Sequence, residues 1–301
     1  MLRLRVITGV SVSAAILAAL FLLPAWTHLL VLFAVFALAQ TEFCGMTKSS
    51  GHRYDLLPTT ICGLTYLVFS AAESPVFIGK YPAVADFHIG GLEPSTVVLV
   101  ITPAILLACG VFRRRTQNAM ETFALSYAGF WYTAVLLAFI IRISYEWETY
   151  PGDATNYTGR IALALFIALV KSGDIGAYFA GMLFGRRKLI PEISPKKTIE
   201  GLIGGYAFSV AISLVFWAVA TTCYDGKLCQ IHYPLIHAIV LPIALTTTGV
   251  IGDLAESLIK RSVNIKDSGS YFPGMGGILD ILDSLLFSAP IAYIYILTFL
   301  K

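Results

Sequence analysis

Carboxylates recur at helical spacing in the C-terminal half of this 301-residue chain. Asp253 and Glu256 are three residues apart, as are Asp280 and Asp283. Residues three apart lie on one face of a helix, so each pair would present two carboxylates to the same neighbour. Acids held close together need a cation to share, and carboxylate oxygens are the hard ligands that Mg²⁺ prefers. The spacing therefore indicates a cation site, with Mg²⁺ as the ion that fits.

Basic residues accompany these carboxylates. Lys171 and Asp174 are also three apart and could form an ion pair, and Lys260 follows Glu256 by one turn. A structural salt bridge explains one such pair as well as a functional site does. Ionisable groups within apolar helices are nevertheless functional candidates by default, and several carboxylates around one loop favour that interpretation.

A phosphate site is predicted in the basic loop over residues 184–200. Ser194 followed by Pro195 is a helix-start signal with Ser194 as the N-cap, and Lys196 and Lys197 come next. Backbone N–H groups and the macrodipole favour anions at the N-terminus of a helix. We therefore expect a helix to begin here and to bind an anion.

A second loop, residues 259–277, ends in three glycines within four residues. Gly274, Gly276 and Gly277 allow positive φ and close approach of the backbone to a ligand, and their N–H groups could form an anion-binding nest. Such a turn is common by itself. Its position between Asp253 and Asp280 is what makes it a candidate for part of the site.

The elements that must position these residues are membrane helices. Hydrophobic residues make up 57% of the chain, charged residues 13%, and the mean hydropathy is +0.78. Soluble domains average about 25% charged residues. The runs lack the alternation of barrel strands, so we predict an all-α polytopic membrane protein. Nine spans are expected, at about 7–25, 27–44, 56–79, 95–112, 122–142, 161–183, 201–222, 234–258 and 278–299.

Charge placement predicts the orientation. Most of the 21 Lys and Arg residues fall in loops on the same side as the N-terminus. By the positive-inside rule, the N-terminus and the loops 184–200 and 259–277 face the cytoplasm. The basic cluster 186–188 is also explained by this rule alone, as a solvated loop.

The chain is predicted to form one membrane domain over residues 1–301. Residues 1–160 would be scaffold helices, in which Glu42 is the main ionisable exception, and residues 161–301 would carry the catalytic helices and loops. The basic N-terminus before the first apolar run also resembles a secretory signal, but no clear small-residue cleavage site follows it.

Two blocks of the C-terminal part resemble a known family. One runs from Asp174 to Phe179 and continues from Ser194 to Gly201. The other comprises Ser257, Lys260, Arg261, Lys266, Asp267, Gly269, Pro273, Gly276, Gly277, Asp280 and Asp283. In order and spacing they resemble the phosphatidate cytidylyltransferase (CDP-diacylglycerol synthase) family. The N-terminal half resembles the family only in being hydrophobic.

The resemblance implies a Mg²⁺-dependent nucleotidyltransferase of phospholipid biosynthesis. The expected reaction is CTP plus phosphatidate, or a related lipid phosphate, giving CDP-diacylglycerol and pyrophosphate. The expected place is the bacterial inner membrane, with the active site facing the cytoplasm. Membrane lipids and a second copy of the chain, in a homodimer, are the implied partners, and no nucleic acid is expected.

The resemblance also implies roles for individual residues. Asp253, Asp280 and Asp283 would hold the metal, with a second cation left open. The catalytic set adds Lys266 and Asp267. The substrate-binding set is Asp174, Ser194, Lys196, Lys197, Thr198, Lys260, Arg261, Gly276 and Gly277.

Two positions depart from the family pattern. Met275 stands where the family usually has His, and Ile281 where it usually has Arg. A potential proton carrier and a phosphate-binding cation are therefore missing, whereas the acids on either side are present. The departures leave open a repurposed or inactive paralogue acting on another lipid phosphate.

Three other classes of membrane protein fit the sequence less well. A transporter also places charges in broken helices, but its polar groups would more often line both halves of the chain. An intramembrane prenyltransferase would need a second paired-aspartate motif beside Asp280 and Asp283. A CDP-alcohol phosphotransferase would need a denser aspartate pattern after an Asp-Gly pair, which is absent.

Overall fold

The computed structural model describes residues 16, 18–81, 87–114, 116–147, 157–272 and 276–300. Helices dominate this part of the chain, and its paired strands form two short antiparallel hairpins. Seven of the described helices are long and apolar enough to cross a membrane. The prediction of an all-α polytopic membrane protein is confirmed.

The helices coincide with the predicted spans from the second onward. In chain order they are α2 (Ala25–Ser49), α3 (Leu56–Ala72), α5 (Pro94–Phe112), α6 (Ala119–Phe130) with η2 (Trp131–Val135) and α7 (Leu136–Tyr145), α8 (Tyr157–Phe184), α9 (Ile199–Cys223), α10 (Leu235–Ser262) and α11 (Ile278–Phe299). A short helix, α4 (Pro75–Lys80), follows α3, because the predicted span 56–79 breaks at Ser74. Most of the span at 7–25 lies outside the described residues, so the count of nine and the orientation stay predictions.

The chain packs as two units. Unit 1 holds residues 1–156 and 262–281, and unit 2 holds residues 157–261 and 282–301. The boundary near residue 157 is close to the predicted division at 160. The glycine-rich loop and the first turn of α11, however, pack with the N-terminal helices. The prediction of one membrane domain remains a prediction.

Unit 1 is a helix cluster with a buried aromatic and aliphatic core. Phe36, Leu67, Phe130 and Leu137, from four different helical segments, are among its fully buried side chains. The Glu73 carboxylate at the end of α3 accepts hydrogen bonds from the backbone N–H (2.6 Å) and hydroxyl (2.5 Å) of Ser95 at the start of α5, and pairs with Arg142 at 3.1 Å.

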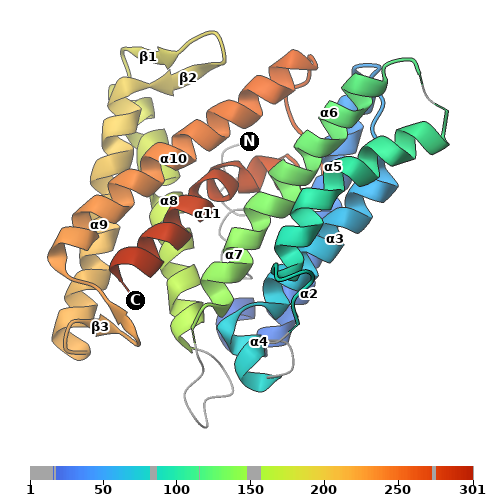
Figure 1. The fold of residues 1–301 in the computed structure, drawn as a ribbon. Helices are drawn as coiled ribbons and strands as arrows, with labels where there is room; N and C mark the ends of the chain where they lie inside the picture. The colour runs from blue at the N-terminus through green and yellow to red at the C-terminus, as the bar shows by residue number, and fades with distance from the viewer. Residues whose placement is uncertain are drawn as a thin grey trace. The chain divides into compact units, whose positions relative to one another are not determined.

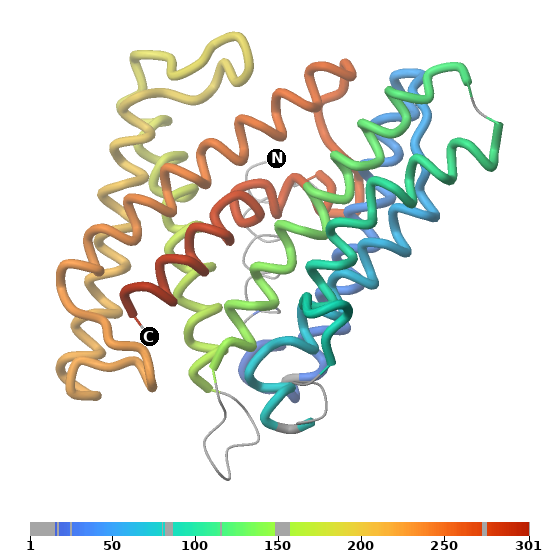
Figure 2. The backbone as a smooth tube through the Cα atoms, viewed as in Figure 1, coloured from blue at the N-terminus to red at the C-terminus, as the bar shows by residue number. Residues whose placement is uncertain are grey.

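Unit 2 is built around the close contact of α8 and α9, which run side by side in Figures 1 and 2. A Cβ atom on Gly176 would lie 2.7 Å from the Gly204 carbonyl oxygen, and one on Gly205 would lie 2.9 Å from the Gly173 carbonyl oxygen. Side chains would push the backbones apart, so glycines let the two helices touch, as small residues do in membrane helix pairs. This contact places Asp174 of α8 beside the N-terminal part of α9.

Helices α10 and α11 also meet through small residues within unit 2. A Cβ on Gly252 would come within 2.8 Å of the Phe287 Cβ, and Gly249 faces Ser284 and Ser288 of α11. Asp253 follows directly after Gly252. The close approach therefore brings this part of α10 to the stretch of α11 that carries Asp283.

The predicted helix start at Ser194 is wrong. Residues Ser194–Thr198 form strand β2, which pairs antiparallel with β1 (Lys188–Ile190). Helix α9 begins four residues later than expected from Pro195, and its N-cap is Thr198, whose hydroxyl accepts the Gly201 N–H at 3.1 Å. The φ of proline also suits an extended strand, so Ser-Pro alone did not decide between the two. The second hairpin is β3 (Lys227–Leu228) with β4 (Ile231–His232).

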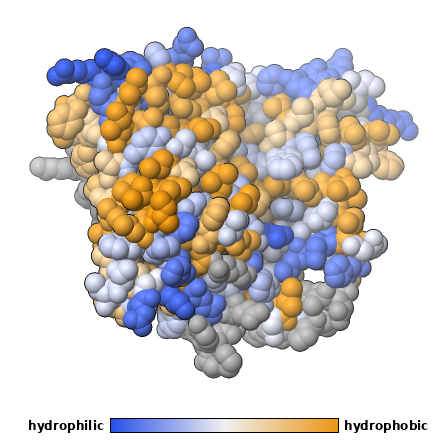
Figure 3. All heavy atoms as spheres, turned by 60° about the vertical axis from the view of Figure 1, so that its left-hand side comes forward, coloured by the Kyte–Doolittle hydropathy of each residue, from blue (hydrophilic) through white to orange (hydrophobic). Residues whose placement is uncertain are grey.

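The outer surface of the helices is apolar, as lipid contact requires. On α9, Ile203, Phe208, Val215 and Val219 are all exposed. In Figure 3 orange apolar side chains cover much of the visible helix surface, and blue hydrophilic residues gather mainly toward the ends of the helices. Exposed apolar surface of this extent belongs in a bilayer rather than in water.

Candidate active site

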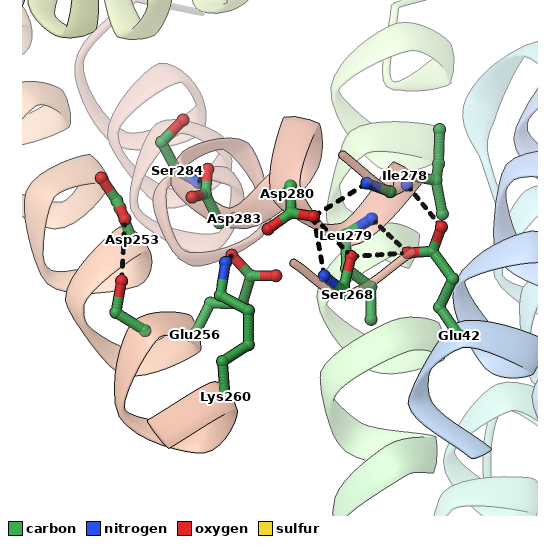
Figure 4. Close-up of polar contacts among 12 residues, drawn as sticks. Glu42, Asp253, Glu256, Lys260, Ser268, Ile278, Leu279, Asp280, Asp283 and Ser284 are labelled. Carbon is green, nitrogen blue, oxygen red and sulfur yellow. Dashed lines mark hydrogen bonds and ion pairs between the residues drawn. The ribbon is translucent and has the colours of Figure 1, made fainter. Parts of the chain in front are cut away.

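The candidate site residues form clusters that belong to each unit separately. In unit 1, Glu42 of α2 reaches the start of α11 (Figure 4). Its carboxylate accepts hydrogen bonds from the backbone N–H groups of Ile278 (2.7 Å) and Leu279 (2.9 Å). It also accepts one from the Ser268 hydroxyl at 2.9 Å. Glu42 is only 5% exposed, so a buried carboxylate from one helix caps the first turn of another.

Asp280 is held by the same loop. Its Oδ2 atom lies 2.9 Å from both the backbone nitrogen and the hydroxyl of Ser268, and 2.8 Å from the Gly277 nitrogen. Gly276 has φ +96°, a conformation that favours glycine, and its backbone pairs with Phe272. A Cβ on Gly277 would collide with Ser268 and Glu42. The predicted nest therefore presents the Gly277 N–H to a carboxylate of the protein itself.

In unit 2, an ion pair joins Lys171 and Asp174 on α8. The Lys171 ammonium lies 3.2 Å from Asp174 Oδ2, which confirms the pair predicted from the spacing. It also lies 2.8 Å from the hydroxyl of Ser284 on α11, and that hydroxyl is 2.9 Å from Asp174. The three side chains form a polar triangle within apolar helices.

A second ion pair in unit 2 joins β2 to α10. The Lys197 ammonium lies 2.8 Å from Asp253 Oδ2, and it donates to the Val250 carbonyl oxygen at 3.3 Å. The other oxygen of Asp253 accepts a 3.3 Å hydrogen bond from Ser257 one turn along the helix. Asp253 remains 36% exposed, so a ligand can reach its carboxylate.

A third pair lies on α10 itself. The Lys260 ammonium is 3.0 Å from Glu256, at the i, i+4 spacing, and both residues are buried (Figure 4). The sequence predicted that Asp253, Glu256 and Lys260 share a face, and the structure pairs the lysine with Glu256. Unit 2 thus holds three lysine–carboxylate pairs, contributed by α8, β2 and α10.

Asp283 lies near the start of α11, just after the point where unit 2 resumes, and its side chain is buried. It interacts electrostatically with Lys171, Asp174, Asp253 and Glu256 of the same unit. Asp280, three residues earlier on α11, belongs to unit 1. The prediction that Asp253, Asp280 and Asp283 share one metal therefore stays a prediction.

The donor chemistry of these residues suits a cation. Within the part of the chain that the structure describes, no three His, Cys, Asp or Glu side chains form a group that could hold a metal ion. The Asp253 carboxylate nevertheless already holds a cation, the Lys197 ammonium. Carboxylate and hydroxyl oxygens are the donors that Mg²⁺ takes, usually one or two carboxylates with water and phosphate. The residues present fit that ion.

Several predicted site residues are exposed rather than clustered. This group consists of Lys196, Arg261, Lys266 and Asp267. Thr198 caps α9 as described above, and Ser194 begins β2. The backbone N–H groups of Arg186 and Arg187 donate to Glu200, at 3.0 and 3.1 Å, so this basic loop is tied to the first turn of α9.

Three side chains of the clusters, Glu42, Ser268 and Ser284, were neither predicted site residues nor members of a predicted pair or motif. Lys171 and Glu256 were predicted only as members of charged pairs, and Ser257 only as part of the family motif. Ser268 and Ser284 each bridge charged groups, and serine spacing carried no signal for that. Glu42 did carry a signal, because it is an ionisable residue inside an apolar run. Of the two departures from the family pattern, Ile281 is half-buried in the first turn of α11, and Met275 lies outside the described residues.

Comparison with known proteins identifies the family of the chain. A family model described as the cytidylyltransferase family matches residues 3–299. A protein of Haemophilus influenzae named phosphatidate cytidylyltransferase is 28% identical over 298 residues, 98% of this chain and 99% of that one. A Bacillus subtilis protein of the same name is 42% identical over 131 residues, 44% of this chain. That alignment spans 45% of the Bacillus protein, less than two thirds of its length. The chain belongs to the cytidylyltransferase family.

Proposed function

We propose that this protein transfers the cytidylyl group of CTP to phosphatidate, giving CDP-diacylglycerol and pyrophosphate. The observation that carries the proposal is the set of three lysine–carboxylate pairs that unit 2 gathers among membrane-length helices. A triphosphate and a lipid phosphate bring negative charge to a membrane surface, and lysines are suited to neutralise it. The names of the Haemophilus and Bacillus relatives support the same activity.

The reaction needs no nucleophile from the protein. An oxygen of the phosphatidate phosphate attacks the α-phosphorus of CTP, and a new phosphoanhydride bond forms. The bond from the α-phosphorus to the oxygen that bridges it to the β-phosphate breaks, and pyrophosphate leaves with the electron pair. Phosphoryl-transfer sites work mainly by positioning their substrates and neutralising charge.

The protein's own residues can do both. We assign phosphate binding to Lys197 and Lys260, with Lys196, Arg261 and Lys266 as exposed basic groups that draw CTP to the surface. When a phosphate takes an ammonium, the carboxylate that held it becomes available to a cation. Asp253 is open to such an exchange, because its side chain is 36% exposed.

Mg²⁺ is proposed as the cation. Asp253, Asp280 and Asp283 remain the residues proposed to bind it. When bound, Mg²⁺ would offset the charge of the phosphates and of the leaving pyrophosphate.

The placement in the cell is part of the proposal. The basic loops favour a site on the cytoplasmic face, where CTP is dissolved and phosphatidate lies in the adjacent leaflet. The bacterial relatives suggest the inner membrane, and the family suggests a homodimer.

A second candidate is transfer to another lipid phosphate. Ile281 supports it, because an apolar side chain stands in the first turn of α11 where the family pattern has arginine. Fewer phosphate contacts in this turn would suit an acceptor with a different headgroup.

The test is a purified-protein assay in detergent with labelled CTP, phosphatidate and Mg²⁺, scored for labelled lipid. We expect Mg²⁺-dependent label in CDP-diacylglycerol, and we expect Asp280→Asn to abolish it while the variant still inserts into membranes. Label found only with other phospholipid acids would support the second candidate. No labelled lipid with any acid would contradict both, and full activity of the variant would remove Asp280 from the metal site.

A further inference from the structure

Glu42 of α2 takes its hydrogen-bond donors from the glycine-rich loop and from the start of α11. It lies inside a span of the scaffold half, where a charge is costly, and it is nearly fully buried. Its oxygens accept hydrogen bonds from two backbone N–H groups of the first turn of α11 and from the Ser268 hydroxyl. These N–H groups have no partner within a helix, and a negative charge at a helix N-terminus is stabilised by the macrodipole.

The glycine-rich loop is shaped around this carboxylate. A Cβ on Gly269 would lie 2.9 Å from Glu42 Cδ, and a Cβ on Gly277 would collide with both carboxylate oxygens. Two glycines that are separated in the sequence therefore leave room for one side chain from α2. This fit accounts for the presence of glycine at both positions, so no bound ligand is needed to explain them.

Ser268 couples Glu42 to Asp280. Its hydroxyl oxygen is 2.9 Å from an oxygen of each carboxylate, and a hydroxyl has one proton to donate. Asp280 is also held by the backbone N–H groups of Ser268 and Gly277. Ser268 and Gly277, which donate to Asp280, also contact or closely approach Glu42, so the position of one carboxylate depends on the other.

We propose that Glu42 is a positioning residue for Asp280: it holds Ser268 and the first turn of α11 so that the Asp280 carboxylate is presented in one fixed orientation. The proposal rests on the proposed function, in which Asp280 binds the metal. It gives the N-terminal half, expected to be scaffold, a direct part in the site. Residues that orient a metal ligand typically change metal affinity or activity by about 10–100-fold when they are replaced.

The experiment compares Glu42→Gln and Glu42→Ala with Glu73→Gln and Glu73→Ala. Glu73 is a matched control, because its carboxylate also caps another helix of unit 1 and its side chain is only 10% exposed, while its hydrogen bonds go to Ser95 and Arg142. The readouts are kcat, the KM for CTP, the Mg²⁺ concentration for half-maximal rate, thermal stability, and amide hydrogen exchange of peptides covering 276–281.

We expect Glu42→Ala to lower kcat and raise the Mg²⁺ requirement by about 10–100-fold, with faster exchange at 276–281. Glu42→Gln should fall between wild type and Glu42→Ala, because an amide keeps one acceptor oxygen. The Glu73 variants should lose stability but keep the Mg²⁺ requirement of the wild type.

Two other outcomes would overturn the proposal in different ways. If the wild type transfers label but the Glu42 and Glu73 variants lose stability alike and keep the wild-type Mg²⁺ requirement, Glu42 is only structural and the proposed function stands. If the wild type transfers no label to any lipid acid, the proposed function fails and positioning for it fails with it. Because Glu42→Gln is isosteric, the comparison survives even if Glu42→Ala does not fold.

Discussion

The carboxylates of the candidate site are held by different kinds of donor in the two units. In unit 1, Glu42 and Asp280 accept hydrogen bonds from backbone N–H groups and lie against a serine hydroxyl. In unit 2, Asp174, Asp253 and Glu256 each lie against a lysine ammonium. These site carboxylates are therefore held by dipoles in unit 1 and by full charges in unit 2.

The two kinds of donor suit two different tasks. Backbone donors fix the position of a carboxylate, whereas a lysine can leave its carboxylate for another anion. Backbone donors belong to a helix turn and define where a carboxylate oxygen lies. A lysine ammonium is a compact charge on a flexible stem, so it can move to a phosphate oxygen when one arrives. Unit 1 is accordingly suited to hold a ligand group still, and unit 2 to give up lysines to phosphates while its carboxylates take a cation.

Among the variants that test this comparison, the largest effect is expected for Asp253→Asn in unit 2. The amide keeps the size of the side chain but removes the charge that pairs with Lys197. We expect kcat to fall by about 100–1,000-fold, the range for loss of one electrostatic contact to a transition state. The fall in kcat is measured from transfer rates over a series of Mg²⁺ concentrations. As a control, hydrogen exchange at 276–281 should be unchanged, because that segment is in unit 1. Wild-type rates throughout the series would show that the unit 2 carboxylate exchanges no cation.

Next in size is Lys197→Met, with Lys196→Met as its neighbour in the same strand. Lys197 faces Asp253, whereas Lys196 is exposed. We expect the KM for CTP to rise about tenfold for Lys197→Met, the size of one hydrogen bond to a charged group, and much less for Lys196→Met. Initial rates at varied CTP provide the measurement. A larger rise for Lys196→Met would mean that the exposed lysine, not the paired one, meets the nucleotide.

The smallest effects should distinguish two serines. Ser268→Ala removes a hydroxyl that lies 2.9 Å from two carboxylates, whereas Ser257→Ala removes a single 3.3 Å hydrogen bond to Asp253. We expect a loss in kcat of roughly five- to tenfold for Ser268→Ala and a barely measurable change for Ser257→Ala. Equal effects would show that the dipole-held carboxylates of unit 1 are no more sensitive to position than the lysine-held ones.

The local sequence pattern was sufficient to predict the helices and the ion pairs that form within one helix. Apolar runs of span length predicted α5 and α8 to α11, because a helix satisfies its own backbone in lipid and needs no information from elsewhere. The Lys171–Asp174 pair followed from i, i+3 spacing for the same reason. The start of α9 was missed, because Ser-Pro suits both a helix start and a strand, and pairing with β1 decided for the strand.

The sequence by itself determined that this is an all-α membrane protein and which family its motifs resemble, and it predicted a site among the paired charges after residue 170. The tertiary structure decided which charges meet. Lys197 faces Asp253 because a hairpin turns β2 toward α10, and Glu42 caps α11 because two glycines leave room for it. Such contacts join residues more than fifty positions apart, where no helical or strand period relates one residue to another.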